Sequence, residues 1–125
     1  MSRSRTGKRL VAAEPTSEAV APKYRFRWSR RSERDLEEIE AYIAADDPVA
    51  AARWVDRLME RAHKVAWVPF SGRAVPELGR ENIREVLLRT YRIVYRIEGS
   101  EIQVLTVFEG HRLFPEDLNT EGDSD

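Results

Sequence analysis

The sequence contains no cysteine, which excludes disulfide bonds and thiolate chemistry. It has only two histidines, and they do not have the spacing of metal ligands, so we predict no metal site and no cofactor. No apolar run approaches the ~18–20 residues that a membrane-spanning helix requires. No apolar stretch of signal-peptide length follows the basic N-terminus. These absences predict a cytoplasmic protein that has no membrane partner.

The composition of the chain is typical of one globular domain. The 125 residues are 42% hydrophobic and 9% aromatic, enough for a single core. Residues 1–23 carry five basic and two acidic residues, whereas residues 116–125 carry five acidic residues and no basic one. We expect these ends to be disordered tails around a domain of residues 24–115. That domain holds sixteen basic and fifteen acidic residues, which argues against direct sequence-specific DNA binding by the chain alone.

The pattern of residues 24–63 predicts a strand and two helices. Aromatic and arginine residues alternate over residues 24–28, which is typical of a short strand. Ser29 is a candidate N-cap of the first helix, and Asp47 with Pro48 is typical of the start of the second. Because two or three residues join the helices, we predict an antiparallel hairpin. Its apolar stripes are Ser32, Leu36, Ile39, Ile43 and Ala51, Val55, Leu58, Ala62, Val65.

Three strands are predicted after a loop that is rich in glycine and proline, over residues 83–88, 90–98 and 101–108. Gly99 and Ser100 are typical of a two-residue hairpin turn. Alternation in the middle strand predicts a buried face of Tyr91, Ile93, Tyr95 and Ile97. In the last strand we expect Leu105 and Val107 to lie opposite Ile102, Val104, Thr106 and Phe108. The fold class is therefore α+β: an N-terminal strand and a helical hairpin, followed by a three-stranded antiparallel meander.

Six short motifs occur in a fixed order within residues 24–115. They are W-S-x-x-S-x-x-D-L-E-E-I-x-x-Y-I (28–43), D-D-P-x-A-A (46–51), V-P-E-L-G (75–79), R-E (84–85), Y-R-I-V-Y-R (91–96) and G-H-R-L-F-P (110–115). This ordered set resembles ParE-type toxins of the RelE/ParE superfamily, the toxin halves of bacterial type II toxin–antitoxin pairs. The resemblance implies a cognate antitoxin, ParD-like or similar, that forms a hetero-oligomer with the toxin. It also implies DNA gyrase as the target.

RelE-like members of the same superfamily instead cleave mRNA on the ribosome, and one fold can serve both activities. Cleavage needs cations for the phosphate and groups that transfer protons. The resemblance implies a Tyr or His beyond the last strand, and only His111 is present there. If the chain is a nuclease, its catalytic residues are therefore His111, Arg89, Arg92 and Arg112. Because a late tyrosine is missing, we favour a toxin without a catalytic residue. A third hypothesis is a non-toxic remnant that only binds an antitoxin.

Arginine is more frequent around the strands than solvation of an outer face requires. We expect Arg89, Arg92 and Arg112 to form one cationic pocket at the strand ends. Cross-strand pairing with glutamate explains Arg84 and Arg96 equally well. Trp67 and Phe70, which follow the helical hairpin, either close the core or anchor a partner. The candidate residues for binding a target or antitoxin are Arg84, Arg89, Arg92, Arg96, His111, Arg112, Trp67 and Phe70.

Overall fold

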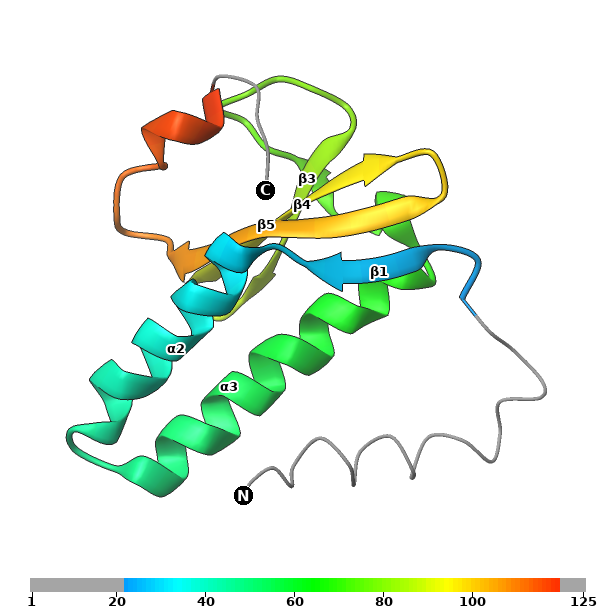
Figure 1. Ribbon diagram of the computed structural model, residues 1–125. Coiled ribbons are helices and arrows are strands. Elements are labelled where there is room, and N and C mark those ends of the chain that lie inside the picture. The colour runs from blue at the N-terminus through cyan, green and yellow to red at the C-terminus, as the bar shows by residue number, and fades with distance from the viewer. Residues whose placement is uncertain (1–21, 120–125) are drawn as a thin grey trace.

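The computed structural model describes residues 22–119, so most of the expected basic tail and the end of the expected acidic tail lie outside the described residues. Two helices lie side by side against one face of a twisted sheet (Figure 1). The regular elements are β1 (Arg25–Trp28), α2 (Arg30–Ala44), α3 (Pro48–His63), β2 (Arg73–Ala74), β3 (Ile83–Leu88), β4 (Tyr91–Glu98) and β5 (Glu101–Glu109). Short 3-10 helices complete the chain: η2 (Lys64–Ala66), η3 (Pro69–Ser71) and η4 (Glu116–Asn119).

Both helices begin at the residues that the sequence predicts. The Ser29 side chain accepts a hydrogen bond from the backbone N–H of Ser32, and the Asp47 side chain accepts one from that of Ala50. Pro48 occupies the first turn of α3, where its missing N–H costs nothing. The predicted α+β fold and its helical hairpin are confirmed, with Leu58 and Ala62 fully buried.

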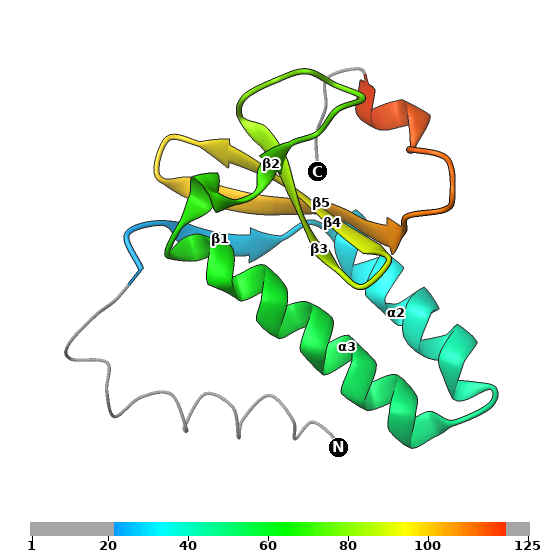
Figure 2. The same ribbon diagram turned by 180° about the vertical axis from the view of Figure 1, so that it is seen from behind.

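The sheet has the strand order β1-β5-β4-β3-β2 (Figure 2). The predicted antiparallel meander is present, and Gly99 adopts a φ of 60° in the turn between β4 and β5. Two features were not predicted. β1 pairs in parallel with β5 at one edge, and the loop before β3 contains the short strand β2, which pairs antiparallel with β3 at the other edge.

The expected alternation along β5 is wrong after Leu105, because the strand contains a β-bulge. Val94 pairs with Thr106 and Tyr95 pairs with Val104, so Leu105 is an extra residue that reverses the faces. Val107 therefore faces the helices, whereas Leu105 and Phe108 pack on the opposite side. Asp35 of α2 accepts hydrogen bonds from the Thr106 hydroxyl and the Val107 backbone N–H, at 2.5 and 3.0 Å. These bonds hold the irregular part of β5 to α2.

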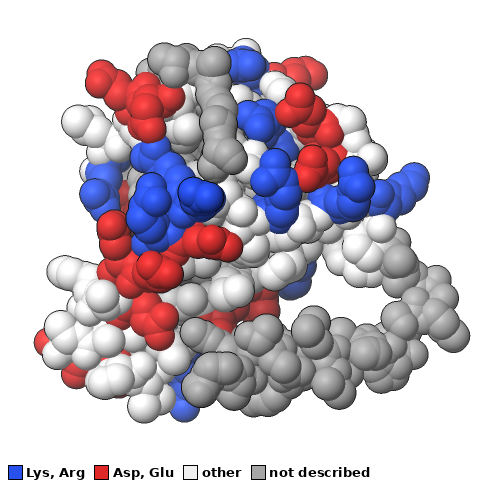
Figure 3. Space-filling model, viewed as in Figure 1, with Lys and Arg blue, Asp and Glu red and all other residues white. Residues whose placement is uncertain are grey.

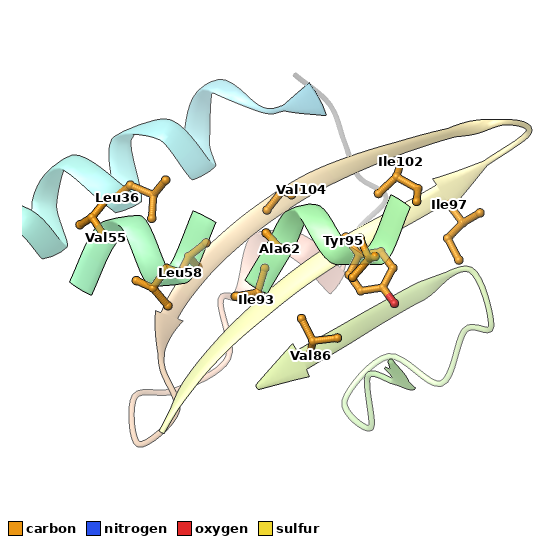
Figure 4. Packing of buried hydrophobic residues seen from close by; sticks show 12 residues of the cluster. Leu36, Val55, Leu58, Ala62, Val86, Ile93, Tyr95, Ile97, Ile102 and Val104 are labelled. Atoms are coloured by element: carbon orange, nitrogen blue, oxygen red, sulfur yellow. The ribbon is translucent and has the colours of Figure 1, made fainter. Parts of the chain in front are cut away.

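Apolar side chains are buried on both faces of the sheet. The helix-side core, shown in Figure 4, comprises Leu36, Val55, Leu58, Ala62, Val65, Val86, Ile93, Tyr95, Ile97, Ile102, Val104 and Val107. The second core, on the other face, comprises Val75, Ile83, Val94, Leu105, Phe108 and Leu118. A tail was expected after Pro115, but η4 places Leu118 in the second core and Asp117 pairs with Arg31. The packed chain thus extends beyond the expected boundary at residue 115.

Candidate functional site

Arg92 lies at the centre of an ion-pair network, here called the arginine network, with Arg73, Glu77 and Glu85. Its Nε donates to Glu85 at 2.7 Å, and its Nη1 and Nη2 donate to the two carboxylate oxygens of Glu77 at 3.0 and 2.8 Å. Arg73 donates to the second oxygen of Glu85 at 2.6 Å. The Glu85 side chain is fully buried, and these two guanidinium groups compensate its charge.

Within the arginine network, Arg92 and Glu77 stabilise each other's charged forms. Hydrogen bonds from Arg92 hold the pKa of Glu77 below its usual value, and the same bonds raise the pKa of Arg92. The Arg92 guanidinium also lies near the rings of Phe108 and Phe114, 5.3 and 5.4 Å from their centroids. Arg92 is therefore bound to protein groups on several sides.

A small cavity of about 260 Å³ brings several predicted site residues together. Arg89, Arg92 and His111 line it, together with Arg73, Leu87, Thr90 and Gly110. Arg89 has a φ of 55° in the tight turn between β3 and β4, a backbone conformation that is costly for a residue with a Cβ. Its guanidinium lies 5.8 Å from the ring centroid of Trp54. The cavity is thus cationic, although Arg92 is neutralised by its carboxylate partners.

His111 is exposed at the turn after β5. Its Nδ1 lies 2.7 Å from the Glu109 carboxylate, and its backbone N–H donates to the same carboxylate at 2.8 Å. This backbone bond, with one from the Thr90 side chain, lowers the pKa of Glu109. The single candidate acid or base is therefore tied to a neighbouring carboxylate, and the side chain is 81% exposed.

A larger hollow, here called the α2–β5 groove, lies between α2, β5 and the segment that follows β5. Its volume is about 590 Å³. Arg112 lines this groove and not the small cavity, so the expected single pocket of Arg89, Arg92 and Arg112 is not formed. The groove is also lined by four residues that carry no sequence signal for a site: Arg31, Ile39, Tyr42 and Leu113. Tyr42 and Leu113 are 82% and 93% exposed, a signal that only the structure provides.

Charge is unevenly distributed along α2. Its sequence begins with arginines and continues with glutamates. Figure 3 shows basic side chains near the start of this helix and acidic side chains below them. The α2–β5 groove therefore combines apolar side chains with both signs of charge, among them Arg31, Asp35, Glu38 and Arg112.

The remaining predicted site residues lie elsewhere. Arg96 donates to the buried Gln103 of β5 and pairs with Glu98 of its own strand, and its side chain is only 21% exposed. Arg84 donates to the backbone carbonyls of Glu81 and Gly72 at 3.0 and 2.7 Å, and its guanidinium lies 4.9 Å from the centroid of the Phe70 ring. Trp67 and Phe70 are exposed and do not close the core.

Within residues 22–119, no three His, Cys, Asp or Glu side chains are grouped closely enough to hold a metal ion. None of the helices in this part of the chain is long and apolar enough to cross a membrane.

Comparisons with known proteins identify the family. The family described as the ParE toxin of the type II toxin–antitoxin system parDE matches residues 26–114. A protein of Sinorhizobium fredii named "Putative toxin Y4kP" is 42% identical over 97 residues, which are 75% of this chain and 96% of that protein. The resemblance that the sequence motifs predict is therefore confirmed.

Two solved structures share the fold. A chain from the chromosomal ParDE toxin–antitoxin system of P. aeruginosa has a TM-score of 0.60 and 23% identity, over 71% of this chain and 98% of that one. A chain from the RelBE2 toxin–antitoxin complex of Mycobacterium tuberculosis has a TM-score of 0.52 and 22% identity, over 72% and 94%. The chain belongs to the ParE toxin family of type II toxin–antitoxin systems, within the RelE/ParE superfamily.

Proposed function

We propose that this toxin stops growth in the cytoplasm by binding a protein, DNA gyrase, and does not cleave RNA. The observation that carries the proposal is the state of Arg92, whose guanidinium is bound to Glu77 and Glu85. A nuclease needs a cation that is available to the phosphate in the transition state. Gyrase is the target because it is the one that resemblance to ParE-type toxins implies.

The position of His111 supports the same proposal. General acid–base catalysis requires a positioned group within hydrogen-bond reach of the reacting atom. His111 instead lies on an exposed turn and contacts Glu109. A toxin that acts by binding needs no residue that transfers a proton.

We further propose that a cognate antitoxin, ParD-like or similar, occupies the α2–β5 groove and forms a hetero-oligomer with the toxin. The two structural neighbours come from systems named ParDE and RelBE. The groove offers Tyr42 and Leu113 for apolar contact and Arg112 for carboxylates, whereas Arg31 already pairs with Asp117. The antitoxin segment should therefore be acidic and partly apolar, and salt should weaken its binding without abolishing it.

The substitution His111→Gln tests the mechanism, because it keeps hydrogen-bonding capacity and removes titration near neutral pH. We expect the variant to inhibit supercoiling by purified gyrase as strongly as the native protein. Induced cells should filament and show DNA damage before translation stops. Cleavage of ribosome-bound mRNA by the native protein, lost in His111→Gln, would contradict the proposal and favour the nuclease.

A further inference from the structure

We propose that Trp67, Val68 and Phe70, here called the 67–70 patch, form the surface that docks on the toxin's protein target. The matching surface of the target is apolar and bordered by carboxylates. This inference rests on the proposed function, because it locates the contact through which the toxin acts. The patch follows the C-terminal end of α3, and none of its residues lines the α2–β5 groove.

The patch exposes three large apolar side chains within four residues. Trp67, Val68 and Phe70 are 48%, 54% and 55% exposed. Their neighbours Val65, Ala66, Pro69 and Gly72 are all buried. The segment is therefore anchored by buried residues on both sides of the three exposed apolar side chains. Single exposed apolar residues are common, but a contiguous group of this kind marks an interaction surface.

The backbone beneath the patch is held in place. The Tyr95 hydroxyl donates to the carbonyl of Pro69 at 2.5 Å, and Nη1 of Arg84 donates to that of Gly72 at 2.7 Å. Gly72 admits no side chain, since an added Cβ would lie 2.6 Å from both the Glu85 carbonyl oxygen and the Tyr95 hydroxyl. The patch is therefore preorganised, and a partner that binds it pays little entropy for ordering the segment.

Basic residues border the patch. The Arg84 guanidinium lies 4.9 Å from the Phe70 ring centroid and, among the described residues, pairs with no carboxylate. Burial raises the pKa of the Tyr95 hydroxyl beneath the patch, and the nearby positive charges of Arg84 and Arg61 offset only part of this rise. Lys64, in η2, is exposed three residues before the first residue of the patch. The Arg92 charge is already compensated by two carboxylates, whereas the Arg84 charge at the border of the patch is not. The border therefore favours a partner that has carboxylates around an apolar centre.

The chemistry of aromatic and arginine residues at a rigid, exposed site is typical of an interface hot spot. A target surface is favoured over the antitoxin, because the α2–β5 groove already offers the antitoxin both apolar and basic groups. Binding to the antitoxin or to a second copy of this chain would each give a distinct result in the experiment below.

The experiment compares the full-length double variant Trp67→Ser/Phe70→Ser with the native protein, each co-produced with its antitoxin and then separated from it. The matched control is Val49→Ser, which replaces an apolar residue, 62% exposed, in the first turn of α3. Inhibition of gyrase supercoiling and growth arrest after induction measure action on the target. Thermal unfolding, co-purification of the antitoxin and the molecular mass in solution are measured in parallel.

We expect the double variant to lose about tenfold or more in potency, as removal of hot-spot side chains does. It should unfold at the same temperature as the Val49→Ser control and still co-purify with the antitoxin. A second variant, Lys64→Glu, keeps the apolar residues and reverses one border charge. It should lose potency less, with the loss greatest at low salt.

Undiminished potency of the double variant would overturn the inference. So would loss of antitoxin co-purification, which would assign the patch to the antitoxin. A native dimer that the double variant dissociates would assign the patch to a second copy of the chain. If the native protein arrests growth without inhibiting gyrase, the proposed function fails, whereas the inference is still decided by whether the double variant arrests growth.

Discussion

The face of the sheet that α2 and α3 cover encloses twelve buried residues, whereas the opposite face encloses six. The helix-side core is apolar apart from the Tyr95 hydroxyl. The second core lies beside the arginine network, whose Glu85 is only 1% exposed. Regular helices can bury a wide apolar stripe, but the irregular segments around Val75 and Phe114 offer less apolar area.

The arginine network therefore stabilises the face that lacks a helical cover. Glu77 belongs to the segment that covers the second core, and Arg92 joins it to Glu85 in β3. Substitutions on the two faces should consequently lower the free energy of unfolding for different reasons. Loss of a side chain from the helix-side core leaves a cavity, whereas loss of Arg92 leaves a buried charge with one partner fewer.

The largest effect on stability is expected for Arg92→Ala. This substitution leaves the fully buried Glu85 with Arg73 as its partner, and removal of one member of a buried pair typically costs about 3–5 kcal/mol. Urea unfolding of the purified variant measures the loss. The double variant Arg92→Ala/Glu85→Ala should recover part of it, because the buried charge is then gone. A loss under about 1 kcal/mol would mean that the network is not a structural element.

Leu58→Ala tests the helix-side core. Leu58 is fully buried between α3 and the sheet, and we expect a loss of about 2–5 kcal/mol from transfer and cavity terms. The loss should be insensitive to salt. Chemical denaturation at low and high salt measures it, and a loss well under about 1 kcal/mol would show that this face is not tightly packed.

Leu118→Ala tests the edge of the second core. Leu118 is 8% exposed on the short helix η4, whose surroundings can collapse around a smaller side chain. The expected loss is therefore near the lower end of the range, about 2 kcal/mol. The control Leu113→Ala, at a leucine that is 93% exposed, should change the free energy of unfolding by less than about 0.5 kcal/mol. Equal losses in the two variants would show that η4 does not pack on the folded domain.

The smallest effect is expected for Glu77→Gln, and it should depend on pH. The pKa of Glu77 lies below its ordinary value of 4.5 because Arg92 donates to it. Its contribution is thus present above pH 4.5 and is lost as the pH falls through the lowered pKa. The pair is partly exposed, so the contribution at neutral pH should be about 1 kcal/mol or less. Native protein and variant should converge in stability in acid; a difference that grows in acid would contradict this.

Local features of the fold could be predicted from sequence, because they depend on neighbouring residues. Ser29, Asp47 and Pro48 specify where the helices start, and Gly99 specifies a turn. The bulge at Leu105 could not be predicted, since it depends on how β5 pairs with β4. The parallel pairing of β1 with β5 likewise joins segments that are distant in sequence.

The candidate site was less predictable than the fold. The number of arginines does not indicate which of them are neutralised. Arg92 is neutralised by Glu77 and Glu85, which come from two other segments. One signal was present: Glu85 is two residues from Ile83 in β3 and so shares its strand face, which is buried. Arg89 was correctly placed near the strand ends, but its left-handed backbone conformation has no sequence signal comparable to that of a glycine.

The position of β1 has a consequence for synthesis of the protein. Among the described residues, β1 pairs only with β5, and the ion pair between Arg27 and Glu101 joins residues 74 positions apart. A chain that emerges from the ribosome can form the helical hairpin early, because its contacts are local. Within residues 22–119 the first strand has no partner but β5, so the five-stranded sheet is complete only when nearly all of the domain has been translated. Until then the helical hairpin lacks the strand that joins β1 to the rest of the sheet, and part of its apolar face stays uncovered.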